Sequence, residues 1–425
     1  MVDRPVKGNP TPVPTSELPA AGVPPSVDDW IASLSGRGAL GALISLPSED
    51  QARLGYGHTL REIAQQPVTW LETADRLQAH GAAIAESLHA VDAVVITGSG
   101  SSIYAAECVA PALQCALGVP VSAVPAGLIL THPESCLPPS GSFLVVSLAR
   151  SGNSPESRAV VDWLLESRPE ARHLLITCNR EGALATSYAA RGQVRTIVLD
   201  EKTNDRSLVM TSSFTNLVLA GLALAGAPQA SQARASGLAR AAAGLLREQA
   251  DAIAGVARGE FGSVVYLGSG CRLGSAREAA LKMLEMNGGN VWTHAESYLG
   301  LRHGPMSAIR PDTLVVAFLS SDPTVRAYER DLLGELDRKA LGARRVVVGA
   351  GVPPAVVATR GGVVLDSDAC ACADEDLTLL DALVAQLLAF FRCLDAGYHP
   401  DSPSEQSVIT RVVSGFEIHR RDGAR

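Results

Sequence analysis

Two segments rich in serine and glycine have the composition of anion-binding loops. They read Gly-Ser-Gly-Ser-Ser at residues 98–102 and Arg-Ser-Gly-Asn-Ser-Pro at residues 150–155. Each follows a short apolar run and precedes a helical stretch, where backbone N–H groups are free to bind an anion. A tight turn capped by serine explains either segment alone, but two such turns on one sheet favour a shared phosphate site. The candidate side-chain donors are Ser101, Ser102, Ser151, Asn153 and Ser154.

A helix expected over residues 275–286 carries its charges on one face. Glu278, Lys282 and Glu285 are spaced i, i+4 and i+7, so their side chains share one side of the helix. The spacing alone also fits a solvated, salt-bridged stripe. The other faces consist of Ala, Leu and Met, which indicates a helix packed on most sides. We therefore expect the charged face to line a cleft, where a carboxylate can carry a proton.

A polar segment follows at residues 292–305, and it contains His294, Glu296 and His303 together with Gly and Pro. We interpret it as a loop. His303 stands before Gly-Pro and is the better candidate for proton transfer, because the ordinary pKa of a histidine lies near neutral pH. His294 fits a buried core histidine equally well.

A duplicated α/β fold must position these side chains. Apolar runs at 92–97 and 263–267 both end in a Gly-Ser-Gly turn that opens a helical stretch. Further strand-like runs at 143–148, 173–177, 195–199, 313–319, 345–348 and 363–365 alternate with helical stretches at 102–117, 155–167, 274–287, 323–340 and 377–394. This alternation is typical of parallel sheets covered on both faces. The predicted fold class is α/β, with two doubly wound, flavodoxin-like parallel-sheet domains.

The expected domains are a tail and lead-in over 1–50, a first domain over 51–230, and a second domain with a C-terminal tail over 231–425. The joint falls in the Ala-, Gly- and Gln-rich stretch near 227–236. Residues 1–25 are rich in Pro, Thr, Ala and Ser and lack the pattern of a signal peptide. We expect them to form a disordered or loosely docked tail.

Composition disfavours several classes of protein. The net charge is −8 and no basic face stands out, so we expect no nucleic-acid partner. No apolar run reaches about 18 residues, so we expect no membrane span. The eight cysteines form no C-x-x-C pair, which indicates buried thiols in a cytoplasmic protein and no zinc site. Neither turn carries G-x-G-x-x-G and no Walker A lysine motif occurs, so no nucleotide, metal or other cofactor is expected.

From about residue 50 onward the chain resembles tandem sugar isomerase (SIS) domains. Glu278-x-x-x-Lys282-x-x-Glu285, Ala295-Glu296 and the segment Arg-His-Gly-Pro at 302–305 resemble the isomerase half of glucosamine-6-phosphate synthase. The resemblance implies that Glu285 is the base for proton transfer between C1 and C2. It also implies that His303, from a neighbouring subunit, opens the sugar ring. The implied phosphate and sugar contacts are Ser101, Ser102, Ser151, Asn153, Ser154, Glu278, Lys282, Arg302 and Arg411.

Four other segments resemble one branch of this family more closely. They are Arg-Glu-Ile-Ala-Gln-Gln-Pro at 61–67, Ser-Leu-Val-Met-Thr-Ser-Ser-Phe-Thr at 207–215, Ser-Ser-Asp-Pro at 320–323 and Arg-Val-Val-Ser-Gly-Phe at 411–416. The branch is that of the tagatose-6-phosphate ketose/aldose isomerases, or galactosamine-6-phosphate deaminase/isomerases. Fewer than 100 residues precede the first predicted strand and residue 2 is Val, so we expect no glutamine-driven amino transfer. The tail carries Arg411 where the synthases carry a lysine, and an arginine cannot form a Schiff base at neutral pH.

The resemblance implies isomerisation coupled to deamination. Galactosamine 6-phosphate would bind in the serine-rich turns, and Glu285 would move the C2 proton to C1. Hydrolysis of the C2 imine would then give tagatose 6-phosphate and ammonia, with Lys282 facing the developing C1 oxyanion.

Other interpretations stay open. An isomerase without deamination, or a fructosamine-6-phosphate deglycase, would keep the fold and change the substrate. A sugar-phosphate sensor without turnover is a third option, although the first 50 residues contain no basic helical pair of the DNA-binding kind. We expect a homodimer or homotetramer and no membrane partner.

Overall fold

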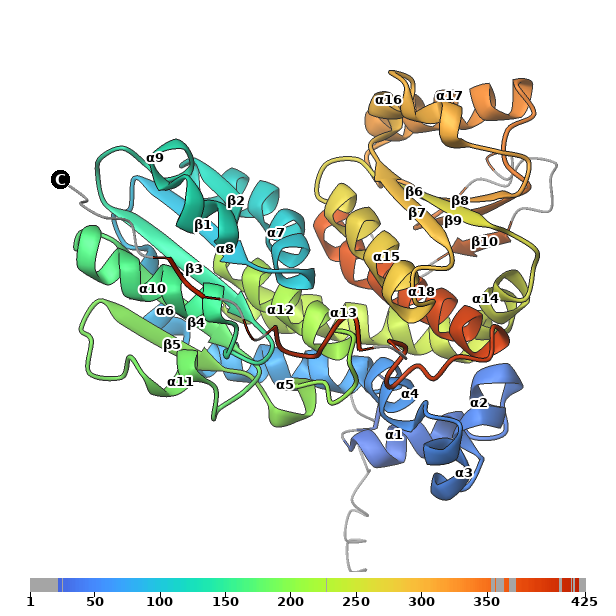
Figure 1. Ribbon diagram of the computed structural model, residues 1–425, viewed down its shortest axis with the longest axis horizontal. Coiled ribbons are helices and arrows are strands. Elements are labelled where there is room, and N and C mark those ends of the chain that lie inside the picture. The colour runs from blue at the N-terminus through green and yellow to red at the C-terminus, as the bar shows by residue number, and fades with distance from the viewer. Residues whose placement is uncertain are drawn as a thin grey trace, which may run out of the picture.

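The computed structural model describes residues 22–24, 26–226, 228–352, 356, 363–366, 372–404, 407–413, 415 and 417–419. Two α/β halves stand side by side, each built around its own sheet (Figure 1). The tail expected over residues 1–25 lies almost wholly outside the described residues, and so does Cys370.

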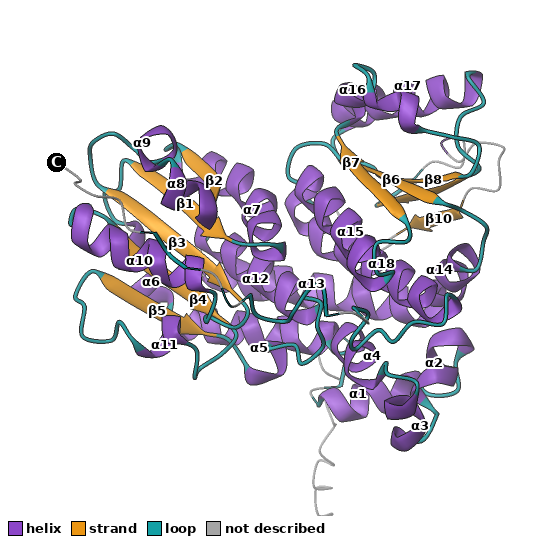
Figure 2. Cartoon of the chain, viewed as in Figure 1, coloured by secondary structure: helices purple, strands orange, loops and turns teal. Residues whose placement is uncertain are grey.

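The first half contains a parallel sheet of five strands in the order β2-β1-β3-β4-β5. All seven residues of β3 are buried, because helices cover both faces of the sheet (Figure 2). The strands are β1 (Ala93–Gly98), β2 (Val121–Pro125), β3 (Phe143–Ala149), β4 (Arg172–Thr177) and β5 (Val194–Val198). The helices around them are α4 (Gly57–Ala64), α5 (Gln66–Ala79), α6 (Gly81–Leu88), α7 (Ser101–Leu117), α8 (Ala126–Thr131), α9 (Pro133–Cys136), α10 (Pro155–Ser167), α11 (Ala183–Thr186), η1 (Glu201–Thr203), α12 (Ser212–Leu222) and η2 (Ala223–Ala225).

The second half repeats this plan with a parallel sheet in the order β10-β9-β8-β6-β7. Its strands are β6 (Ser263–Leu267), β7 (Trp292–Glu296), β8 (Thr313–Phe318), β9 (Arg344–Gly349) and β10 (Val363–Asp366). Its helices are α13 (Pro228–Gly244), the π-helical turn η3 (Leu245–Gln249), α14 (Ala250–Ala257), α15 (Arg272–Met286), α16 (Tyr298–Leu301), η4 (Pro305–Ala308), α17 (Pro323–Arg338) and α18 (Asp374–Asp395).

Both sheets have the same topology when each is numbered from its own first strand, namely 2-1-3-4-5. This is the flavodoxin-like order, and the predicted duplication and fold class are confirmed. In such sheets ligands bind beyond the carboxyl ends of strands 1 and 3, where the strand order reverses. In the first half those strands are β1 and β3, and the two serine-rich turns follow them directly.

Two strands were missed in the sequence, and both occupy the second position of their half. β2 lies at one edge of its sheet and β7 at one edge of the other, so each is paired on one side only. Most of their residues are partly exposed, so the sequence shows no continuous apolar run. The segment that we interpreted as a loop at 292–305 therefore begins with strand β7.

The expected lead-in before residue 50 is helical from Val27 onward. Its helices are α1 (Val27–Leu34), α2 (Gly38–Ile44) and α3 (Ser48–Arg53). Trp30 is fully buried, and its Nε1 donates to the carbonyl of Ala64 at 2.7 Å. The expected joint near 227–236 is likewise not a loose linker, since from Pro228 it forms the start of helix α13.

One helix among the described residues, α18, is long and apolar enough to cross a membrane. However, 89% of the most apolar stretch of α18 is buried inside the protein, which is typical of the core helix of a globular protein.

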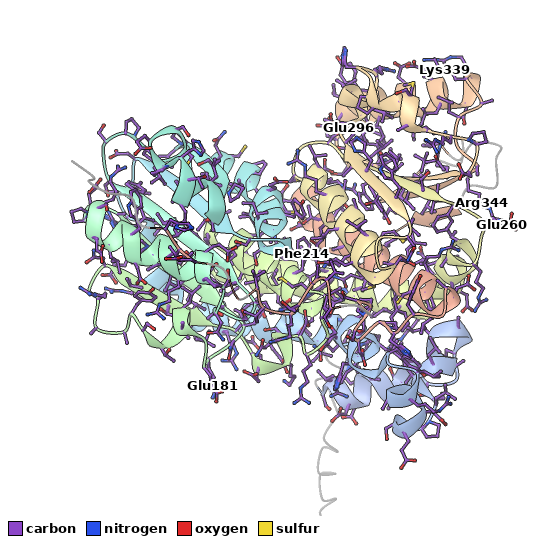
Figure 3. The ribbon with its side chains drawn as sticks, in the orientation of Figure 1. Glu181, Phe214, Glu260, Glu296, Lys339 and Arg344 are labelled. Carbon is purple, nitrogen blue, oxygen red and sulfur yellow. The ribbon has the colours of Figure 1, made fainter. Side chains whose placement is uncertain are left out.

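The two halves meet along helices α7 and α15, which approach closely. A Cβ atom on Gly274 would lie 2.8 Å from the backbone nitrogen of Cys108, so only glycine allows this approach. An ion pair of 2.7 Å between Arg277 and Glu107 joins the same helices. Phe214 of α12 lies near the middle of the molecule (Figure 3). After α18 the chain crosses from the second half back to the first, as the dark red segment shows (Figure 1).

Candidate active site

A cavity of about 540 Å³ lies where the two halves and the C-terminal segment meet. The turns after β1 and β3 form one wall, Glu285 of α15 contributes another, and residues 407–413 close a third. Segments from both halves of the duplication and from the end of the chain therefore build one site.

The turn after β1 contributes Ser101 and Ser102, both of which line the cavity at the start of α7. No side chain caps this helix. A Cβ on Gly98 would lie 2.6 Å from the Cβ of Ser102, so glycine is required for the helix to start this close to the strand. The first turn of α7 therefore presents two hydroxyls and the positive end of the helix dipole to the cavity.

The turn after β3 contributes Ser151 and Ser154, which also line the cavity. Ser154 occupies the N-cap position of α10, as predicted, with Pro155 as the first helical residue. Its hydroxyl makes no capping bond and instead donates to the Glu156 carboxylate at 2.5 Å. We call the turns at 98–102 and 150–155, with the helix starts behind them, the first cradle.

Asn153 differs from the prediction. Its Oδ1 accepts the backbone N–H of Ala183 at 2.8 Å, and the residue does not line the cavity. The amide side chain holds the neighbouring loop, because an Asn in a turn readily binds a backbone N–H group.

The charged face of α15 is buried and is not a solvated stripe. Glu278 and Lys282 are at most 1% exposed, and Glu285 reaches the cavity with 22% of its side chain exposed. The ammonium of Lys282 lies 2.5 Å from a Glu285 oxygen and 3.5 Å from a Glu278 oxygen.

Burial raises the pKa of Glu278 to about 8, although the ammonium of Lys282 lowers it and the Glu285 carboxylate adds to the rise. Burial would lower the pKa of Lys282, but its interactions with Glu278 and Glu285, including the hydrogen bond to Glu285, outweigh this effect and the net pKa is raised. At neutral pH the helix therefore presents a charged lysine beside a mostly neutral Glu278. Neighbouring carboxyl groups whose pKa values are pushed apart by their environments are suited to different roles in acid–base chemistry.

Arg150 was not among the predicted site residues, yet it lies at the centre of the site. It lines the cavity and is 7% exposed, and its guanidinium donates to the carbonyls of Ser207, Leu208 and Arg411. Arg411 also lines the cavity, as expected. Its guanidinium, however, donates to the Asp205 carbonyl at 2.8 Å and to Asn204 Oδ1 at 2.7 Å.

His303 and Arg302 are not brought to this cavity within one chain. His303 is exposed and follows α16, which lies at the outer end of the second half (Figure 1). Arg302 forms ion pairs with Asp331 and Glu335 of α17. Glu296 accepts the N–H of Ser297 at the start of α16, and His294 stacks on Trp292.

The second half has an equivalent of the first cradle, and the protein's own side chains fill it. We call the turns at 268–272 and 320–323 the second cradle. Arg272 occupies the position of Ser102, because each residue donates its backbone N–H to the serine three positions earlier. The Arg272 guanidinium is fully buried against Asp381 and carbonyls of the adjoining strands, so it blocks this turn.

Carboxylates occupy the remaining donors of the second cradle. Asp374 accepts from the Ser320 hydroxyl at 2.5 Å and from the backbone N–H of Ser321 at 2.6 Å. Asp322 caps α17 by accepting two N–H groups, at 2.8 and 2.9 Å. The groups that could bind an anion are thus satisfied internally in the second half. In the first cradle Ser154 binds the Glu156 carboxylate, but the hydroxyls of Ser102 and Ser151 bind no carboxylate within the described part of the chain.

The similarity of this chain to known proteins is specific. No family model matches. A D-galactosamine-6-phosphate deaminase AgaS from Escherichia coli O157:H7 is 34% identical over 367 residues, which cover 85% of this chain and 95% of the relative. A Streptomyces coelicolor protein that carries the same name provisionally is 37% identical over 395 residues, 88% of this chain and 97% of its own length. The chain belongs to the AgaS family.

A solved structure agrees with this assignment. The crystal structure of tagatose-6-phosphate ketose/aldose isomerase from Escherichia coli superposes with a TM-score of 0.78 and 33% identity, over 86% of this chain and 97% of that one. The resemblance to this branch of the sugar isomerase (SIS) proteins is thereby confirmed, as is the enzyme class.

In this AgaS-family chain the motif at 61–67 supports the cavity from behind. Glu62 is buried and accepts the backbone N–H groups of Arg206 and Ser207 at 2.5 and 3.2 Å. Gln65 donates to the Lys202 carbonyl at 2.6 Å. Asp205 accepts the N–H groups of Thr211 and Ser213. The motif therefore fixes the 202–213 segment, whose carbonyls bind Arg150 and Arg411.

Proposed function

We propose that this chain converts D-galactosamine 6-phosphate and water to tagatose 6-phosphate and ammonia. The activity in the names of its AgaS relatives supports this proposal. The observation that carries it is one cavity that combines a serine-rich cradle with Glu285, whose carboxylate is paired with the buried Lys282.

The phosphate is assigned to the first cradle. Two helix starts without a side-chain cap, those of α7 and α10, border this cavity and attract an anion through the helix dipole. Ser102 and Ser151 add hydroxyl donors at the same place. Ser154 adds a third when its hydroxyl turns from Glu156 to the phosphate. The second cradle offers no competing site, because its donors already bind Asp374 and Asp322.

Glu285 is the proposed base because, of the three charged residues on its face of α15, it alone lines the cavity. Its carboxylate takes the C2 proton of the open-chain amino sugar, which gives an enolamine. The proton returns at C1, and the C2 imine that results is hydrolysed to the ketone and ammonia. The steps are proton transfers, addition of water to the C2 imine and cleavage of its C–N bond with loss of ammonia, so the conversion needs no oxidant.

Lys282 holds Glu285 in place through the 2.5 Å contact and brings a positive charge to the developing C1 oxyanion. Glu278, mostly neutral at neutral pH, lies behind this pair and leaves Glu285 as the charged carboxylate beside Lys282.

The ring-opening histidine is proposed to come from another copy of the chain. His303 is exposed and does not line the cavity that holds Glu285, which supports a contribution in trans within a homo-oligomer. Mixing inactive Glu285→Gln and His303→Ala proteins tests this assignment. Hybrid oligomers regain activity if the site is shared, whereas a histidine that acts in its own chain gives none.

The activity itself is tested by following ammonia release from galactosamine 6-phosphate, with glucosamine 6-phosphate in parallel. Ammonia from the galacto sugar alone supports the proposal and its C4 preference. Interconversion of sugar phosphates without ammonia would instead favour the pure ketose/aldose isomerase named for the solved relative. A cytoplasmic location stays a prediction.

A further inference from the structure

The C-terminal wall of the cavity is held by few contacts. We call residues 407–413 the tail segment. Val408 and Val413 are 80% and 52% exposed, so apolar packing does little to hold it. The backbone N–H groups of Ser407 and Ile409 donate hydrogen bonds only to Ser404, which lies a few residues earlier in the chain.

Two arginines join the tail segment to the first half, and their bonds cross. Arg150, from the turn after β3, donates to the Arg411 carbonyl at 2.6 Å. Arg411, from the tail segment, donates back to the Asp205 carbonyl and to Asn204. Within the described part of the chain, no other hydrogen bond links the tail segment to the first half.

The anchor beneath these arginines is rigid. Arg150 also binds the carbonyls of Ser207 and Leu208, and Glu62 holds the backbone of that loop from below. The tail segment is thus fixed to the same loop from two sides, while its own packing is loose.

The tail segment also separates two cavities. The cavity with the first cradle shares Glu285, Val408 and Ile409 with a second cavity of about 560 Å³, which opens beside Tyr398. If the tail segment moved away, Glu285 would face one larger, open space, and the cradle would lose its third wall.

We propose that Arg150 and Arg411 are positioning residues that latch the tail segment over the active site. The latch keeps the wall beside the sugar closed while Glu285 moves the proton, and it opens for sugar entry and product release. This inference deepens the proposed function, on which the kinetic part of its test rests.

Trypsin cleavage after Arg411, followed by intact mass, tests the latch without reference to catalysis. Cleavage requires Arg411 to leave Asp205 and Asn204 and enter the protease. We compare wild type with Arg150→Met and Asn204→Ala, and use Arg195→Met as the control, because Arg195 pairs with Glu86 away from the cavity. Loss of one charge-assisted hydrogen bond predicts cleavage about tenfold faster in Arg150→Met.

Asn204→Ala removes the side-chain acceptor of Arg411 and an exposed hydrogen bond to Glu201, and it leaves the buried Arg150 in place. It therefore keeps the test valid if Arg150→Met fails to fold. We expect faster cleavage in both variants, unchanged cleavage in Arg195→Met, and a KM for galactosamine 6-phosphate raised about tenfold in Arg150→Met with a smaller change in kcat. Cleavage as slow as wild type in folded Asn204→Ala and Arg150→Met would overturn the latch. Absence of ammonia release in wild type would refute the proposed function and leave the cleavage result to decide the latch.

Discussion

Glutamate-to-glutamine changes at two positions on one helix should lower activity to very different extents. Glu278 and Glu285 lie on the same face of α15 and share Lys282 as a partner. Glu285 faces the cavity, whereas Glu278 is wholly buried. The same substitution in both places therefore separates the base from the residue behind it.

The expected losses in kcat follow from the protonation state of each carboxyl group. With a pKa of about 8, Glu278 is about nine-tenths protonated at pH 7, and glutamine reproduces this neutral, hydrogen-bonding form. We expect Glu278→Gln to lower kcat by less than about tenfold. Glu285→Gln removes the general base, and such a loss lowers kcat by about 10²–10⁴, or about 3–5 kcal/mol of barrier.

The assay is ammonia release at saturating galactosamine 6-phosphate and pH 7, with binding of the sugar phosphate measured in parallel. Glu285→Gln should still bind the sugar, because the first cradle is unchanged. Equal losses in both variants, or a larger loss in Glu278→Gln, would refute the division of roles on α15.

Three further predictions concern the cradles and pH. Ser151→Ala should raise the KM for the sugar phosphate about tenfold, whereas Ser321→Ala, the matching position of the filled second cradle, should leave it unchanged in steady-state kinetics. Isothermal titration of Glu285→Gln should give one sugar phosphate per chain, and two would contradict the internal occupation of the second cradle. Burial raises the pKa of Glu278 from 4.5 when unfolded to about 8 when folded, so its contribution to stability is full below about pH 4.5 and is lost as pH rises through 8. Melting temperatures of Glu278→Gln should accordingly decline less than those of wild type between pH 5 and 8, and parallel declines would argue against the buried acid.

The strands and the face of α15 could be predicted because their signals are local. The buried run of β3 and the i, i+4, i+7 spacing of Glu278, Lys282 and Glu285 are both visible within one element. The edge strands β2 and β7 gave no such signal, since one of their edges is unpaired and their side chains are half-exposed.

The role of Arg150 could not be predicted, because its partners are distant in sequence. Its acceptors lie 57 and 261 residues further along the chain, and no periodicity links them. Asn153 and Ser151 could not be told apart in the sequence, because they are close neighbours of similar polarity. They stand in one polar turn, and only the fold shows that the serine faces the cavity while the asparagine holds Ala183.

Proton transfer by Glu285 during deamination is the central claim, and a reaction in D₂O tests it most directly. We would convert galactosamine 6-phosphate with wild-type protein and examine the sugar product by proton NMR. The account predicts that part of the tagatose 6-phosphate carries one deuterium at C1, because the Glu285 carboxyl exchanges its proton with solvent between the two transfers, and that one equivalent of ammonia is formed. Product without deuterium at C1 in any fraction, as a direct hydride shift would give, or product formed without ammonia, would contradict it.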